Sequence, residues 1–148
     1  MGEFTMLMGT CEHRLDSKGR LVLPAKFRSE LGSTVVCTVG LDRCVAVYST
    51  DGWEKYLAKL QTLPFAKESA RRFMRVVLGS ADELPVDGAG RILVGAFLKD
   101  YAGLGEQVTI VGVSDHVELW NSERWNAGRD DILKDFESLA EGVGDFGV

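Results

Sequence analysis

Two short segments of the sequence share one pattern of charged residues, Asp-x-x-x-Arg, that is suited to binding an anion. The first runs from Asp16 to Arg20 and the second from Asp87 to Arg91, and a glycine precedes each arginine. Asp and Gly are typical of tight turns. Across such a turn the carboxylate can hold the guanidinium, whose forked N–H donors suit phosphate or the O6 and N7 atoms of guanine. A carboxylate that only staples its turn explains the same residues equally well, and both roles can hold together.

Further basic residues surround the first arginine and are mostly absent around the second. In the second segment Ala89 stands in place of Lys18, and Gly95 stands in place of Pro24. A dense cluster of basic side chains suits contact with the phosphates of a nucleic acid backbone. The candidate binding residues of the first segment are Arg20, Lys18, Asp16, Arg14, Lys26 and Arg28, and those of the second are Arg91 and Asp87.

The charge of the chain is distributed unevenly along its length. The 148 residues carry 17 basic and 22 acidic side chains, a net charge of −5 that by itself argues against a nucleic acid partner. Residues 1–80 hold 12 basic and 8 acidic residues, residues 81–128 hold 3 and 8, and residues 129–148 hold 2 and 6. Charges more than about 8–10 Å apart are largely screened in physiological salt. A basic surface in the first half can therefore still bind an anion.

The two charged segments belong to a tandem repeat that organises the chain. At an offset of 71 residues, Asp16, Gly19, Arg20 and Ala25 match Asp87, Gly90, Arg91 and Ala96. We predict repeats over 8–55 and 79–127, connecting helices over 56–78, and an acidic C-terminal helix or tail over 128–148. Neither repeat is long enough to bury a good core alone, so we expect the two to interleave their strands in one structural unit.

Each repeat is predicted to contain a strand, a tight turn, a second strand, a short helix and a hairpin. In the first repeat the helix begins at Pro24 and ends at Gly32, and the hairpin strands cover 34–39 and 44–48. Further helices are expected over 51–63 and 67–78, with a last helix from Ser122 that fades at Gly142. The expected fold class is α+β, mainly β, with the interleaved strands in a small barrel and the helices at its periphery.

Four segments of the sequence together resemble one known family. They are Met-x-Met-Gly-Thr at the start, Leu-Asp-Ser-Lys-Gly-Arg-Leu-Val-Leu-Pro-Ala-Lys-Phe-Arg from Leu15, Val-Asp-Gly-Ala-Gly-Arg-Ile-Leu-Val from Val86, and Val-Glu-Leu-Trp-Asn-Ser-Glu-Arg-Trp from Val117. In this order they are similar to the MraZ family, bacterial proteins with two AbrB-like (SpoVT/AbrB) domains. The resemblance extends from about Met6 to Ala140.

The resemblance implies a duplicated swapped-hairpin AbrB-like barrel and a ring-shaped homo-oligomer. It also implies a sequence-specific transcriptional regulator, which we expect to be a repressor, of the division and cell-wall gene cluster. Such a protein would be cytoplasmic and nucleoid-associated and would bind direct repeats in double-stranded DNA upstream of its own operon. The DNA-binding arginine of the family falls on Arg20, with Asp16 and Lys18 beside it, and Asp87 and Arg91 match the second motif. No cofactor or membrane association is implied.

The residues give only weak support to two alternatives, a metal site and an enzyme active site. Cys11, His13, Cys37 and Cys44 form a permitted zinc ligand set, but their spacing matches no common zinc module. Buried thiols in a reducing cytosol are the simpler interpretation. Apart from His13, the only other histidine is His116, and no nucleophile elbow or phosphate-cradling glycine loop is present. We therefore expect no catalytic residues and no metal.

A protein-interaction module, or an AbrB-like antitoxin-type partner binder, is the main alternative to DNA binding. The acidic C-terminal segment or the basic helix face with Arg71, Arg72 and Arg75 would then be the docking surface. A solvated helix face explains the same charges. The two functions differ in one measurable property, because affinity for DNA falls steeply with salt and depends on Arg20.

Overall fold

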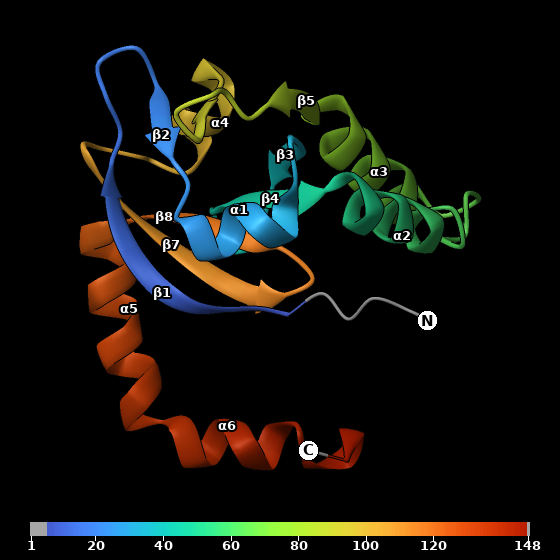
Figure 1. Ribbon diagram of the computed structural model, residues 1–148. Helices are drawn as coiled ribbons and strands as arrows, with labels where there is room; N and C mark the ends of the chain where they lie inside the picture. Colours follow the sequence, from blue (N-terminus) through green and yellow to red (C-terminus); the bar gives the residue numbers. More distant parts are fainter. Residues whose placement is uncertain (1–5, 148) are drawn as a thin grey trace.

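The computed structural model describes residues 6–147 and has the same order of elements in both halves of the chain (Figure 1). The first half contains β1 (Leu7–Arg14), β2 (Arg20–Val22), α1 (Ala25–Leu31), β3 (Thr34–Val39), β4 (Val45–Ser49) and α2 (Thr50–Leu60). After α3 (Glu68–Gly79), the second half contains β5 (Asp82–Pro85), β6 (Arg91–Leu93), α4 (Ala96–Tyr101), β7 (Gln107–Ser114), β8 (Val117–Asn121) and α5 (Ser122–Lys134). The chain then forms α6 (Phe136–Gly142) and a 3-10 turn (Gly144–Phe146). Val148, the last residue of the predicted tail, lies outside the described residues.

Both sheets contain strands from the two halves of the chain, which are interleaved. One antiparallel sheet has the order β1-β7-β8-β4-β3-β5, and β2 and β6 form a separate two-stranded ribbon. The pairs β1–β7, β4–β8, β3–β5 and β2–β6 therefore each join one half to the other. This confirms the predicted interleaving and the α+β, mainly β fold class. In the chain, β2 of the ribbon follows β1, and β6 follows β5. Strands β1 and β5 are the two edges of the six-stranded sheet and do not pair with each other in residues 6–147.

The ribbon has an approximate two-fold symmetry that follows from the sequence repeat. Leu21 pairs with Ile92, its equivalent at the offset of 71 residues. On one side of this pair the backbone N–H of Leu23 donates to the carbonyl of Gly90 at 2.9 Å. On the other side the N–H of Val94 donates to the carbonyl of Gly19 at 2.8 Å. The turn of each repeat is thus hydrogen-bonded to the strand end of the other repeat.

A single hydrophobic core is assembled from equivalent residues of the two halves. Leu21 and Ile92 lie at its centre with 0% and 1% of their surface exposed, and neighbouring positions follow the same correspondence. The short helices contribute Phe27 from α1 and Leu98 from α4, which are equivalent at the same offset. Burial of large apolar side chains is the main favourable contribution to folding, so neither half retains its core without the other.

The helices α2 and α3 lie side by side at one end of the sheet (Figure 1). The side chain of Ser49 caps α2 by accepting a hydrogen bond from the N–H of Gly52 at 3.0 Å. The buried hydroxyl of Thr38 donates to the carbonyl of Val77 at 2.6 Å and so ties α3 to β3. Helix α2 ends at Leu60, three residues before the predicted end at 63. No helix in the described range is both long and apolar enough to cross a membrane.

The predicted last helix is broken in two. Helix α5 ends at Lys134, and α6 begins at Phe136 after Asp135, whose backbone has φ −103° and ψ 13°. Every residue from 129 to 147 is exposed, so no packing within the chain supports a continuous helix here. Aspartate also has a poor helix propensity in a helix interior. The prediction of one helix from 122 to 142 is therefore wrong at this position.

We predict that Leu21→Ala lowers the free energy of unfolding by about 2–5 kcal/mol, because it leaves a cavity at the centre of the shared core. Thermal unfolding followed by circular dichroism measures the change. The transition should remain single, since the two repeats share one core. Leu93→Ala on the adjacent exposed position serves as the matched control and should change the free energy by less than about 0.5 kcal/mol. Equal losses in the two variants would contradict the shared core.

Candidate nucleic-acid interface

The first Asp–Arg turn (residues 16–20) is held by the side chain of Asp16. Oδ1 of Asp16 accepts hydrogen bonds from the backbone N–H groups of Lys18 and Arg20, both at 2.9 Å. Oδ2 accepts from Nε of Arg20 at 2.7 Å. Gly19 has a φ of 84°, in the left-handed region that glycine adopts without strain. One carboxylate therefore fixes both the turn and the guanidinium, and contact of this arginine with an anion stays a prediction.

The second Asp–Arg turn (residues 87–91) has the same geometry. Oδ1 of Asp87 accepts from the N–H groups of Ala89 and Arg91, both at 2.9 Å, and Oδ2 accepts from Nε of Arg91 at 2.8 Å. Gly90 has a φ of 77°. At the start of the following helix, Gly95 has φ −63° and ψ 152°, close to the −58° and 145° of Pro24. The substitutions in the second repeat thus leave its backbone unchanged.

Hydrogen bonds lower the pKa of both carboxyl groups. The backbone N–H of Arg20 is the main cause that lowers the pKa of Asp16 below its ordinary value, and the side chain of Arg20 and the N–H of Lys18 lower it further. The N–H of Arg91 lowers the pKa of Asp87 in the same way. The carboxylates therefore remain anionic hydrogen-bond acceptors throughout the neutral pH range and hold the arginines in a charge-assisted contact.

The two guanidiniums keep donors available for a ligand. Each arginine uses Nε for its aspartate, and the described residues provide no hydrogen-bond partner for the Nη atoms of Arg20 or Arg91. About a third of each side chain is exposed. A guanidinium has five N–H donors, so four remain for an anion or a base edge. The contact with aspartate therefore leaves the Nη edge of each guanidinium free for a ligand.

The β2–β6 register places both arginines on the outer face of the ribbon. We call this surface the outer ribbon face; it consists of Arg20, Val22, Arg91 and Leu93. Arg20 lies opposite Leu93, and Arg91 lies opposite Val22, while the buried Leu21 and Ile92 point to the other side. The arginines are therefore diagonal neighbours, and such positions are roughly 7–8 Å apart in an antiparallel pair. One surface thus presents two held guanidiniums with apolar side chains between them.

The other basic residues expected at the interface are placed differently from one another. Lys18 is exposed in the turn itself, next to Arg20. The guanidinium of Arg28 lies against Gly90, so it packs on the turn of the second repeat. Lys26 lies against Gly9 of β1 and 5.0 Å from the centre of the Phe27 ring.

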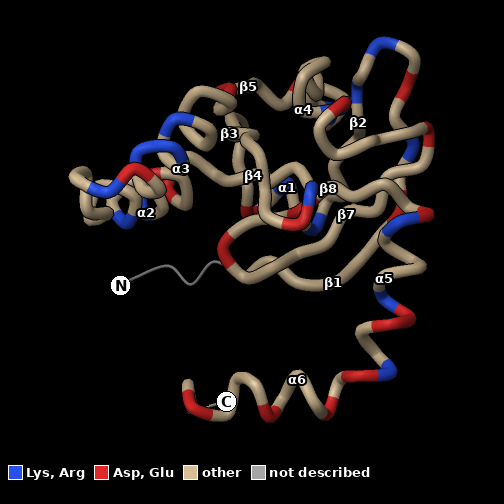
Figure 2. Tube along the Cα trace, turned by 180° about the vertical axis from the view of Figure 1, so that it is seen from behind, with Lys and Arg blue, Asp and Glu red and all other residues tan. Residues whose placement is uncertain are grey.

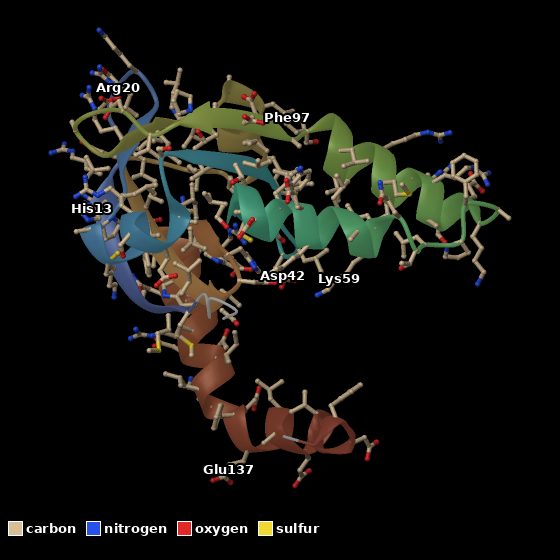
Figure 3. All side chains as sticks on the ribbon, turned by 45° about the vertical axis from the view of Figure 1, so that its right-hand side comes forward. His13, Arg20, Asp42, Lys59, Phe97 and Glu137 are labelled. Carbon is tan, nitrogen blue, oxygen red and sulfur yellow. The ribbon has the colours of Figure 1, made fainter. Side chains whose placement is uncertain are left out.

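Within residues 6–147, Arg14 is the one member of this predicted set that forms an ion pair with an acidic residue outside the motifs. It contacts Glu106, and both side chains are largely exposed. The equivalents of Arg14, Lys18 and Lys26 at the offset of 71 residues are Pro85, Ala89 and Phe97, so the second turn lacks these charges. The two turns therefore share their geometry but differ in electrostatic potential. In Figure 3, Arg20 lies at the tip of the molecule, away from Lys59 on α2 and Glu137 on α6.

The candidate zinc ligands are separated by the fold. Cys11 lies on β1. Cys37 is buried on β3 in the core cluster, and Cys44 is buried in the hairpin, directly before β4. Burial raises the pKa of Cys37 to about 12, and the pKa of Cys44 is also raised, chiefly by burial. Both thiols are therefore protonated at neutral pH and are poor metal ligands or nucleophiles. No group of three or more potential metal ligands occurs in residues 6–147.

Two features of the surface are not apparent from the sequence. The first is Leu93, 53% exposed opposite Arg20 on the outer ribbon face, which only the register of β2 and β6 reveals. The second is an apolar groove of about 670 Å³ between α3 and the sheet, which we call the α3 groove. Its lining includes Tyr48, Tyr56, Phe73, Val76, Tyr101 and His116. The helical spacing of the apolar residues in α3 was the only signal for it.

His116 joins the wall of the α3 groove to a small acidic cluster. Its ring stacks on Tyr48 with the ring centres 4.9 Å apart. Its Nδ1 lies 2.7 Å from Oδ1 of Asp115, and its Nε2 lies 3.5 Å from Oε2 of Glu118. Burial alone lowers the pKa of His116, but the hydrogen bonds and charges of Glu118 and Asp115 outweigh burial and raise it above its ordinary value. The His116 side chain is therefore only 18% exposed, although it lies in the turn between β7 and β8.

Comparison with known proteins assigns the chain to a family. A family model described as "MraZ protein, putative antitoxin-like" matches twice, over residues 6–76 and 77–141. The chain is 45% identical over 143 residues to a protein of Thermoanaerobacter sp. (strain X514), and 46% identical to one of Caldanaerobacter subterraneus subsp. tengcongensis. A protein of Halothermothrix orenii is 42% identical. Each match covers 97% of this chain and all of the relative, and each relative is named "Transcriptional regulator MraZ". The chain therefore belongs to the MraZ family.

Proposed function

We propose that this protein is a transcriptional regulator that binds double-stranded DNA through the outer ribbon face. The observation that carries the proposal is the pair of guanidiniums, Arg20 and Arg91, each held by an aspartate with its Nη donors free on one exposed surface. The relatives named as transcriptional regulators support the same conclusion. The protein acts by binding, as a repressor, without catalytic residues, cofactor or metal.

The dimensions of the ribbon suit the DNA major groove, which admits a two-stranded β-ribbon. The free edge of each guanidinium can donate two hydrogen bonds to O6 and N7 of guanine or to a phosphate. Leu93, between the arginines, offers an apolar contact of the kind that reads the methyl group of thymine. Lys18 adds charge beside Arg20, and Arg28 adds charge beside the turn of Arg91, so both can contact the flanking phosphates. The first repeat thus contributes more of the affinity than the second.

Repetition of this weak site in a homo-oligomer supplies the affinity that one chain of net charge −5 lacks. A ring of subunits can engage several direct repeats upstream of its own operon, which we assign to the division and cell-wall gene cluster. The protein then acts in the cytoplasm, on the nucleoid. In this organisation residues 8–55 and 79–127 form the DNA-binding repeats, 56–78 connect them, and 128–148 form the acidic tail.

Binding of a protein partner is a second candidate function, and two observations favour it. The α3 groove is apolar and open, and the family model carries the words "antitoxin-like" in its description. The groove shares no lining residue with the outer ribbon face, and α2 and α3 lie apart from β2 in Figure 1. The two functions therefore use separate surfaces, and loss of Arg20 affects only the first.

We predict that Arg20→Ala lowers the affinity for operator DNA by at least 10-fold, because one bidentate contact discriminates by about 1–3 kcal/mol and several subunits lose it together. Fluorescence anisotropy with promoter DNA at physiological salt measures the change, and the slope of log K against log salt should fall by about one per lost phosphate contact.

Arg91→Ala, in the same backbone geometry with fewer basic neighbours, should lose less affinity than Arg20→Ala. Lys59→Ala on α2 removes a positive charge far from the ribbon and should leave the affinity unchanged (Figure 3). Retention of sequence-specific binding by Arg20→Ala would contradict the assignment of this surface.

We predict that Asp16→Asn weakens DNA binding several-fold although it removes a negative charge from the interface. Asparagine can still accept the two backbone N–H bonds through Oδ1, but its amide nitrogen cannot accept from Nε of Arg20. A mere count of charges predicts the opposite, tighter binding. The matched control is Glu12→Gln, which removes an exposed charge from β1 without touching the turn. Tighter binding by Asp16→Asn in the same anisotropy assay would show that the carboxylate does not position the arginine.

A further inference from the structure

The C-terminal arm, residues 129–147, extends from the body of the protein without covering its own apolar side chains (Figures 1 and 2). All of its residues are exposed, and Phe136 is 62% exposed. The large apolar residues of the arm are Ile132, Leu133, Phe136, Leu139, Val143 and Phe146. A helix as short as α6 is marginal in isolation, and amphipathic helices are normally stabilised by packing of their apolar face. The arm therefore requires a surface to pack on.

The apolar and acidic residues of α6 occupy opposite sides of the helix. Phe136, Leu139 and Val143 follow one another at intervals of three and four residues, which places them on one face. Glu137 and Glu141 project from the other side of the same turns. The arm as a whole carries six acidic and two basic residues, a net charge of −4. Its partner should accordingly be an apolar depression with a basic surround.

The α3 groove is an apolar depression that borders the basic helix pair α2 and α3, and its lining also includes Glu118. Phe73 and Val76 of α3 line it and are exposed, Val76 by 54%. Its volume of about 670 Å³ is sufficient for several large side chains. Arg72 also lines the groove, and residues 50–79, which include α2 and α3, carry six basic and three acidic residues, a net charge of +3. In Figure 2 the basic residues gather on this helix pair, whereas the acidic ones dominate α6.

The arm does not occupy the groove of its own chain. Helix α5 contacts β7 and β8, and α6 then runs below β1 and stays apart from α2 and α3 in both opposite views (Figures 1 and 2). We propose that the arm of one protomer docks in the α3 groove of a second copy of this chain, with Phe136 and Leu139 inward and the acidic side toward the basic helix pair. This inference rests on the homo-oligomer of the proposed function and specifies the contact between its subunits.

An arm and a groove at different places on one chain form a head-to-tail contact. Each protomer then donates one arm and accepts another, and such contacts close into a ring when the rotation between neighbours permits. The contact lies away from the outer ribbon face, so assembly and DNA binding use separate residues of each chain.

Two complementary variants test the inference. Phe136→Asp with Leu139→Asp disables the arm, and Val76→Asp disables the groove; all three side chains are exposed, so the fold should be retained. Each variant alone should have the native mass of a single chain, whereas the wild-type protein has that of the oligomer. An equimolar mixture retains one working arm and one working groove and should stop at a dimer. Native mass spectrometry distinguishes these states.

Phe97→Asp is the matched control, since Phe97 is also 62% exposed but lies on α4, outside the arm and the groove. It should keep the wild-type mass. A wild-type mass for the arm variant, a monomeric wild-type protein, or a mixture that stays monomeric would overturn the inference. Arg20→Ala should leave the mass unchanged. Failure of the DNA-binding proposal would therefore appear as an unchanged DNA affinity of this variant in an intact oligomer. The arm variant should keep weak, Arg20-dependent binding to a single DNA repeat.

Discussion

The pairing of β2 with β6 is the constraint on which the rest of the structure depends. It places Leu21 against Ile92 at the centre of the core and lets each turn hydrogen-bond to the other repeat. Because a two-stranded ribbon is marginal by itself, its stability comes from the apolar side packed on the six-stranded sheet. The opposite side is then free of any packing role. The fold thus separates a buried surface that determines stability from an exposed surface on which side chains can serve binding.

The aspartate–arginine pairs have more effect on geometry than on stability. Exposed ion pairs typically contribute less than about 1 kcal/mol, and both pairs here are more than a third exposed. Each aspartate nevertheless makes three hydrogen bonds that fix the backbone and the guanidinium together. An arginine held in this way loses less conformational entropy on binding than a free one. The carboxylate reduces the local positive charge, and the gain in preorganisation compensates for that reduction.

The parts of the structure that depend on local sequence could be predicted, and the parts that depend on distant pairing could not. The turn at Asp16, the helix after Pro24 and the hairpin strands follow from neighbouring residues. By contrast, the exposed position of Leu93 and the packing of Arg28 on Gly90 follow from the register between the two repeats. The repeat itself indicated that strands are exchanged, but single-sequence patterns do not specify which residue faces which. The break at Asp135 was missed because apolar spacing continues through it.

Fusion of the two repeats in one chain gives the outer ribbon face a direction. In a dimer of separate identical repeats, symmetry would force both turns to carry the same residues, and the surface would suit a palindrome. Here Lys18 has its equivalent in Ala89, and Lys26 has its equivalent in Phe97, while the backbone geometry of the two turns is preserved. The two turns of the ribbon are therefore not equivalent, since Lys18 stands beside the first and Arg28 of the first repeat packs on the second. For the DNA binding proposed above, a face without two-fold symmetry suits sites that all point the same way along a promoter.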